Sequence, residues 1–353
     1  MKNLITDLDD EYTSLAAEEK GAAEITGFMD TGCYMLNALL SGSIFGGVPN
    51  NRITAFAGEE ATGKTFFALS VVKNFLDNDE EAVVVYYDTE ASISAKMMKD
   101  RGIDVNRVIL AEPTTIQNFK HHALKLLKAY ESRKERPPML MILDSLGMLS
   151  TTKEIEDSEK GSETKDMTRA QVIRGTFRVL TLKLARVKVP MILTNHTYDA
   201  VGSYFPKKEM SGGGGLKYAA SSIAFLAKKK EKDGTDVIGN IIRVTMNKTR
   251  IAKENKSAEL LLRYDTGLDR YYGLLPLAEK YGIISKSGRQ YILPDGSKVF
   301  GKTINDAPES VFTEEILDKL DEAAHREFKY GNQSELGSTE TVPELEEEEY
   351  SET

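Results

Sequence analysis

Residues 52–76 read RITAFAGEEATGKTFFALSVVKNFL, and this stretch of the 353-residue chain decides the fold. It begins as an apolar strand and continues as a helix, and the letters between them fit the phosphate-binding pattern G-x-x-x-x-G-K-[ST]. Glycines let the backbone approach phosphate oxygens, while amides and the helix N-terminus face the anion. The residues predicted to surround a triphosphate are Gly58, Glu59, Glu60, Ala61, Thr62, Gly63, Lys64 and Thr65.

The chemistry of this loop predicts ATP and Mg²⁺ as its ligands. Lys64 would neutralise the β- and γ-phosphates, and the Thr65 hydroxyl would bind Mg²⁺. A second strand, PPMLMILD, ends at Asp144, a carboxylate suited to hold Mg²⁺ through its water shell. A third, AVVVYYDTE, ends in Asp88 and Glu90, either of which could polarise the attacking water. Spacing does not choose between them, and a helix-capping carboxylate is the alternative.

Strand-like and helix-like segments alternate through the middle of the chain, which predicts an α/β fold with a mostly parallel central sheet. From Ser221 the pattern changes to strands joined by short polar turns, which we expect to extend one edge of the sheet as antiparallel strands. Past Tyr271 we expect a small C-terminal subdomain. The predicted parallel strands are 52–57, 82–88, 108–111, 139–144 and 190–194, and the predicted helices are 64–76, 93–101, 115–131 and 167–188.

Composition indicates a cytoplasmic protein with no membrane partner. The longest apolar runs are strand-length, below the roughly 20 residues that a membrane helix needs. The N-terminus lacks the basic start and apolar run of a secretory signal, and the single cysteine, Cys33, excludes an internal disulfide.

Eight glutamates and no lysine or arginine lie in residues 335–353, so the tail holds most of the net charge of −9. The rest of the chain is nearly neutral, which leaves a nucleic-acid partner open. We expect this tail to be disordered. It would serve either solubility or regulation, by competing with DNA for basic sites.

Two predicted loops have the composition of a nucleic-acid interface. After the first, at about 153–168, the helix 167–188 carries six cations and no acidic residue; Arg169 and Arg174 lie nearest the loop, and a solvated basic face is the alternative. The second, at about 197–217, combines aromatic rings for stacking with lysines for phosphates, as in proteins that hold single strands. Its candidate residues are Tyr198, Tyr204, Phe205, Lys207, Lys208, Gly212 and Gly213.

Several motifs together resemble the RecA family of homologous recombinases, and within it the UvsX-type phage recombinases. They are TGCYMLNALLSG, YYDTE, MILDSLG, EIED, MTRA, NHTY and the run of four glycines. The resemblance covers about residues 28–270. It implies a RecA-like P-loop ATPase core, and a host cytoplasm if a phage encodes the chain.

The resemblance also assigns roles to single residues. Glu90 matches the catalytic glutamate and His196 the sensor of the γ-phosphate, while Lys248 and Arg250 match cations that reach the neighbouring subunit's ATP, with an exposed strand-end pair as the alternative. Met97 stands where many relatives place a tyrosine against adenine, so base selectivity would be looser. The residues matching those inserted between groups of bases are Met167, Val201 and Phe205.

The implied organisation has an N-terminal oligomerisation segment (1–27), the ATPase and DNA-binding core (28–270), the small C-terminal subdomain (271–333) and the acidic tail (334–353). The implied function is a DNA-dependent ATPase that forms filaments on single-stranded DNA and exchanges strands in recombination, repair and recombination-dependent replication. Its expected partners are single-stranded DNA, double-stranded DNA during exchange, further copies of itself, and single-strand-binding and mediator proteins. The alternatives are a hexameric helicase with the same core and a non-catalytic mediator that uses ATP as a switch.

Overall fold

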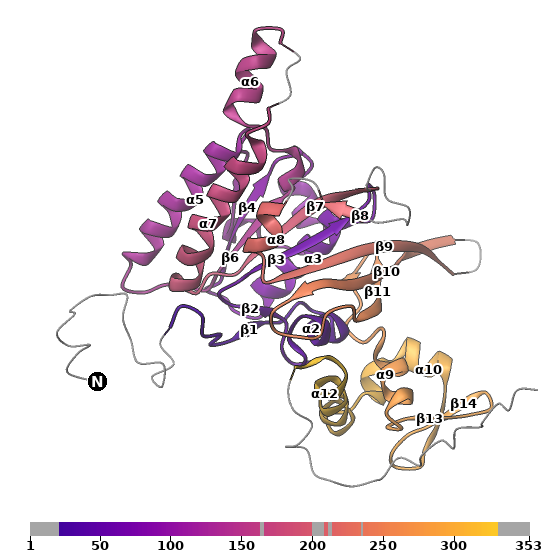
Figure 1. The fold of residues 1–353 in the computed structure, drawn as a ribbon. Coiled ribbons are helices and arrows are strands. Elements are labelled where there is room, and N and C mark those ends of the chain that lie inside the picture. The colour runs from indigo at the N-terminus through magenta and orange to yellow at the C-terminus, as the bar shows by residue number, and fades with distance from the viewer. Residues whose placement is uncertain (1–20, 163–165, 200–207, 211–213, 234–235, 331–353) are drawn as a thin grey trace, which may run out of the picture.

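A ten-stranded sheet forms the centre of the computed structural model, which describes residues 21–162, 166–199, 208–210, 214–233 and 236–330 (Figure 1). Its strand order is β12-β11-β10-β9-β3-β7-β6-β4-β5, with β8 paired to β7. Neighbours from β9 through β5 are parallel, and the neighbours from β9 through β12 are antiparallel. The strands are β3 (Ile53–Gly58), β4 (Val83–Asp88), β5 (Val108–Ala111), β6 (Met139–Asp144), β7 (Met191–Asp199), β8 (Lys208–Met210), β9 (Ser222–Asp233), β10 (Asp236–Thr249), β11 (Ser257–Arg263) and β12 (Gly267–Leu268).

Helices cover both faces of this sheet, so its parallel strands are buried on both sides. Along β3, Ile53, Ala55 and Ala57 face the layer of α5 and α7, while Phe56 faces the layer of α2 and α3. This two-sided burial explains the continuous apolar runs in the sequence and confirms the predicted α/β class. The flanking helices are α2 (Tyr34–Ser41), α3 (Lys64–Asp77), α4 (Ala95–Lys99), α5 (Ile116–Glu131) and α7 (Arg169–Val187).

The structure differs from the predicted pattern in three places. The first strand after Ser221, β9, is parallel to β3, so the antiparallel edge begins only at β10. The first predicted loop contains α6 (Thr152–Glu159), which projects from the top of Figure 1 and begins with a capping box between Thr151 and Glu154. The second predicted loop contains the end of β7, the strand β8 and the helix α8 (Gly214–Ala219).

The C-terminal elements pack on the core through α12 (Glu314–Phe328). This helix shares an apolar cluster with α2 and with α9 (Leu274–Lys280). Asp321 accepts hydrogen bonds from Ser43 Oγ at 2.6 Å and from the Ile44 amide at 2.8 Å. The remaining elements are β1 (Phe28–Met29), β2 (Val48–Pro49), β13 (Ser285–Ser287), β14 (Gln290–Ile292), β15 (Lys298–Phe300), α10 (Gly301–Asp306), α11 (Pro308–Val311) and the short 3-10 helices Val105–Arg107 and Leu146–Met148. No helix in the described part of the chain is long and apolar enough to cross a membrane.

Glu327 of α12 forms a polar junction between the C-terminal elements and the core. Its carboxylate accepts from Lys256 at 2.6 Å, Lys280 at 2.5 Å and the Tyr281 hydroxyl at 2.8 Å. Burial alone would raise the pKa of Glu327, but these hydrogen bonds and the charge of Lys256 outweigh burial and bring it to about 2. Because the folded pKa lies below the ordinary value, this stabilisation is present above about pH 5 and lost as the pH falls towards 2.

We therefore predict that Glu327→Gln lowers the free energy of unfolding by about 1–2 kcal/mol at pH 7, because two cations lose a partly buried partner. The deficit should shrink towards pH 3. Urea denaturation at both pH values measures it. Glu315→Gln on the same helix, which breaks an exposed pair with Lys319, should change stability by less than about 0.5 kcal/mol. Equal effects of the two substitutions would contradict the role of this junction.

Candidate nucleotide site and DNA-facing loops

The phosphate loop lies between β3 and α3, at the carboxyl edge of the parallel strands. Its backbone is fixed by close contacts: a Cβ on Gly58 would lie 2.9 Å from the Leu226 carbonyl oxygen and 2.8 Å from Thr62 Oγ1. Gly63 caps α3 with φ 86° and a left-handed conformation. These constraints explain why glycine stands at both ends of the loop. They also place the first amides of α3 towards the loop, as anion binding requires.

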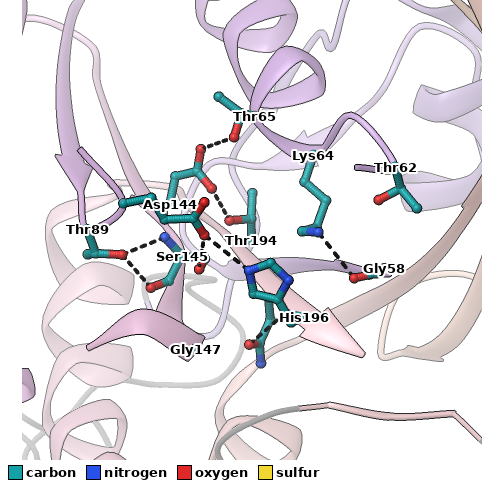
Figure 2. A network of polar contacts seen from close by, with 12 residues as sticks. Gly58, Thr62, Lys64, Thr65, Thr89, Asp144, Ser145, Gly147, Thr194 and His196 are labelled. Atoms are coloured by element: carbon teal, nitrogen blue, oxygen red, sulfur yellow. Dashed lines mark hydrogen bonds and ion pairs between the residues drawn. The ribbon is translucent and has the colours of Figure 1, made fainter. Parts of the chain in front are cut away.

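Lys64 extends its ammonium group into the loop. Its Nζ donates to the carbonyl oxygen of Gly58 at 3.2 Å (Figure 2) and to that of Glu59 at 2.8 Å. Burial lowers the pKa of Lys64, and the nearby charges of Glu90 and Asp144 oppose that shift. The ammonium is therefore held where a triphosphate would provide stronger, charged acceptors.

Thr65 and Asp144 meet at the predicted Mg²⁺ site. Thr65 Oγ1 donates to Asp144 Oδ2 at 2.7 Å, although 79 positions separate them in sequence. No cluster of three or more histidine, cysteine or acidic side chains that could hold a metal occurs within the described ranges. One hydroxyl and one carboxylate fit Mg²⁺, which usually takes few protein ligands and completes its shell with phosphate and water.

Asp88 and Glu90 have different environments. Asp88 is 1% exposed, and its carboxylate accepts hydrogen bonds from the backbone amides of Glu90 at 3.0 Å and Ile93 at 2.8 Å. These bonds close the turn after β4. Glu90 instead accepts from Ser145 Oγ at 2.6 Å and contacts His196 Nε2 at 3.1 Å. This geometry favours Glu90 as the group that faces the attacking water and gives Asp88 the capping role.

The Glu90 carboxylate is held in its charged form. Burial raises its pKa, but hydrogen bonds from Ser145 and His196, with the charges of His196 and Lys64, outweigh burial and lower it overall. A charged carboxylate accepts a hydrogen bond from water, as a general base must.

His196 joins the nucleotide site to the second loop. Strand β7 is parallel to β3 with Gly58 opposite His196, so the imidazole lies beside the phosphate loop. Two residues later the same strand carries Tyr198, whose side chain is exposed. One continuous strand therefore connects the contact with Glu90 to the predicted DNA loop.

Lys248 and Arg250 lie at the end of β10, where they donate to carbonyls around the C-terminus of α8. Lys248 Nζ donates to the oxygens of Lys217 and Ala220, the latter at 2.8 Å, and Arg250 donates to Tyr218 at 3.1 Å. Cations are favoured at this end of a helix. The structure describes a single protomer, so a role on a neighbour's nucleotide stays a prediction.

The predicted base contact, Met97, is partly buried against the core cluster, and its carbonyl accepts from Arg101 at 3.1 Å. Arg101 stacks over Phe66 with its Cζ 4.3 Å from the ring centroid. Arg101, Phe66 and the exposed Tyr264 line a pocket beside α3, and Met97 is not among its lining residues.

In the first predicted DNA loop Met167 is 82% exposed, and Arg174, one turn into α7, is also exposed. Arg169 differs, because its guanidinium donates to the Gly147 carbonyl at 2.8 Å and lies 3.9 Å from Glu154. The opposite side of α7 packs into the core, where its apolar residues are all buried: Ile173, Phe177, Leu180, Leu184 and Val187.

The second loop is described only in part. Lys208 pairs with Glu59 of the phosphate loop, so this lysine contacts protein as well as facing solvent. Six of the predicted contacts lie outside the described residues: Val201, Tyr204, Phe205, Lys207, Gly212 and Gly213.

The packing at Gly58 generates a prediction. Gly58→Ala should weaken ATP binding at least about tenfold, because the new methyl group displaces the loop from Leu226. Fluorescence titration with a labelled ATP analogue measures this loss. The control is Gly175→Ala, since a Cβ there meets nothing within 4 Å in α7; it should leave binding unchanged and stabilise the helix by about 1 kcal/mol. Normal ATP affinity in Gly58→Ala would show that the loop is not the phosphate site.

Comparison with known proteins agrees with this geometry. The family model of the RecA N-terminal domain matches residues 10–269. The "Recombination and repair protein" of Enterobacteria phage T4 is 31% identical over 252 residues, which cover 71% of this chain and 63% of that protein, less than two thirds of its length. "Protein RecA" of Clavibacter michiganensis subsp. michiganensis is 28% identical over 283 residues, covering 78% and 73% of the two chains. "Protein RecA" of a Nocardioides species is 28% identical over 306 residues, covering 81% and 83%.

The matched span contains the phosphate loop, Asp144, Glu90, His196 and both predicted DNA loops. It covers well over half of the chain, and the chain therefore belongs to the RecA family.

Proposed function

We propose that this protein is a DNA-dependent ATPase that assembles on single-stranded DNA and exchanges homologous strands in recombination, repair and recombination-dependent replication. The observation that carries the proposal is the position of His196 between the nucleotide site and the second loop. Its imidazole contacts Glu90, its backbone lies opposite Gly58, and its strand continues to Tyr198 in the second loop. ATP and DNA would therefore act on the same strand.

The ATPase step follows from the arrangement around Glu90. Lys64 and the loop amides would hold the triphosphate, and Thr65 and Asp144 would hold Mg²⁺, which neutralises charge that develops on the phosphate oxygens. Glu90 would orient the attacking water and accept its proton. Ser145 and His196 both contact Oε1 of Glu90 and so orient its carboxylate.

DNA would bind where the two loops emerge from the sheet. The exposed Met167 belongs to the first loop, the exposed Arg174 to α7 directly after it, and the exposed Tyr198 to the second loop. An aromatic ring stacks on bases of any sequence, and cations neutralise phosphates, which suits single-stranded DNA. Double-stranded DNA during exchange, and single-strand-binding or mediator proteins, are further partners in this proposal.

Assembly would place Lys248 and Arg250 against the ATP of a neighbouring protomer, with residues 1–20, which lie outside the described residues, packing on the adjacent core. The end of the predicted oligomerisation segment instead packs on its own core, since Ala22 and Glu24 accept hydrogen bonds from Asn51 at 3.0 and 2.8 Å. In the assembled arrangement the γ-phosphate competes with the α8 carbonyls for both cations. ATP binding and filament formation would then favour each other, because ATP binds the assembled state more tightly.

The first test concerns Glu90. Single-stranded DNA should stimulate ATP hydrolysis, and Glu90→Gln should reduce turnover by at least about 100-fold while ATP binding persists, because the amide cannot accept a proton. Phosphate release and binding of a labelled ATP analogue measure the two effects. Glu135→Gln, at an exposed position, is the control. Turnover that does not respond to DNA would sink the proposal and favour an ATP-switch mediator.

The second test concerns His196. His196→Ala should retain ATP binding but lose most of the stimulation by DNA, because Glu90 loses its link to β7. His196→Gln should keep much of it, since an amide can still donate to the carboxylate. The ratio of turnover with and without single-stranded DNA measures the coupling.

Electron microscopy with DNA and a non-hydrolysable ATP analogue should show helical filaments, and closed rings would favour a helicase instead.

A further inference from the structure

The carboxylate of Asp144 receives hydrogen bonds from hydroxyls on three different elements. Thr65 Oγ1 of α3 donates to Oδ2 at 2.7 Å, and the Tyr86 hydroxyl of β4 donates to the same oxygen at 2.8 Å. Thr194 Oγ1 of β7 donates to the other oxygen, Oδ1. Figure 2 shows Thr65 and Thr194 reaching Asp144 from separate directions. Both carboxylate oxygens are therefore engaged.

The sheet register produces the contacts with Tyr86 and Thr194. Tyr86 is opposite Ile142, and side chains two positions apart share a face, so Tyr86 lies diagonally beside Asp144. On the other side Leu143 is opposite Leu193, which places Thr194 next to Asp144. Asp144 thus stands between one hydroxyl from each neighbouring strand.

The contacts from Tyr86 and Thr194 differ from the contact from Thr65 in burial. Tyr86 and Thr194 are 0% exposed, and Asp144 is 2% exposed. Thr65, in contrast, stands at the start of α3 in the phosphate loop, where its hydroxyl can turn towards a metal. The bonds from Tyr86 and Thr194 therefore belong to the sheet and would persist when Thr65 changes partner.

A carboxylate needs such support because rotation about its terminal torsion is soft. Hydrogen bonds to both oxygens fix the plane of the group, and Mg²⁺ requires a near-ideal octahedral arrangement of its ligands, including its waters. Partners of a metal-binding group commonly change metal affinity by 10- to 100-fold when removed.

We propose that Tyr86 and Thr194 are positioning residues that hold the Asp144 carboxylate for Mg²⁺ and thereby set the Mg²⁺ concentration at which the nucleotide binds tightly. The inference rests on the proposed nucleotide site. It extends that site by two side chains that contact neither the nucleotide nor the metal.

The experiment measures binding of a labelled ATP analogue to the full chain over a Mg²⁺ titration, and separately in EDTA. Tyr86→Phe and Thr194→Val should each raise the half-saturating Mg²⁺ concentration about tenfold, with affinity in EDTA unchanged. Thr194→Ser keeps a hydroxyl and should restore the wild-type Mg²⁺ response. A general loss of packing would lower the affinity in EDTA as well.

Tyr87→Phe is the matched control, because Tyr87 is equally buried in β4 but its hydroxyl contacts His122 Nδ1, at 3.0 Å on the other face. It should leave the Mg²⁺ response unchanged.

A wild-type response in Tyr86→Phe, or equal defects in Thr194→Ser and Thr194→Val, overturns the inference. Should Thr194→Val not fold, Tyr86→Phe decides alone, since it removes one oxygen atom. Wild-type protein without Mg²⁺-dependent nucleotide binding would overturn the proposed function itself.

Discussion

A buried negative charge at the end of β6 is the constraint on which the rest of this structure depends. A carboxylate that is almost withdrawn from water is costly unless its oxygens are hydrogen-bonded. Asp144 meets that requirement with hydroxyls from β4, β7 and α3. A shift of either neighbouring strand by one residue would turn its hydroxyl to the other face. The charge that serves the nucleotide site thus also favours one register of the central strands.

The same strand order explains why the nucleotide site and the proposed DNA site are adjacent. Because β7 lies between β3 and β6, its residues face the phosphate loop on one side and the Asp144 strand on the other. Thr194 donates a hydrogen bond to Asp144, His196 contacts Glu90, and Tyr198 is exposed further along the strand. Alternate residues of a strand share a face and the rise is roughly 3.3 Å per residue, so these three side chains lie about 7 Å apart along one strand. No mobile linker is needed between them.

The sequence predicted the parts of the site that are local. The loop from Gly58 to Thr65 is a contiguous motif, and Asp144 ends an apolar strand, so both were found without a structure. The choice between Asp88 and Glu90 depends on how the chain turns after β4, which the pattern does not contain. Tyr86 and Thr194 resembled ordinary strand residues because their importance comes from strand order. The helix α6 was missed although its capping box, Thr151 and Glu154, was present in the sequence.

Two of the cations expected to bind DNA already contact protein groups, so DNA would have to compete with those contacts. Arg169 donates to Gly147 and lies near Glu154, while Lys208 pairs with Glu59 in the phosphate loop. The Lys208 pair is largely exposed, and exposed pairs contribute little to stability, so a DNA phosphate competes with Glu59 at small cost. In the proposed function, the replacement of Glu59 by a DNA phosphate as the partner of Lys208 would release Glu59 from the second loop. Since coupling between two sites is reciprocal, a nucleotide that moves the phosphate loop would in turn alter the availability of Lys208 to DNA.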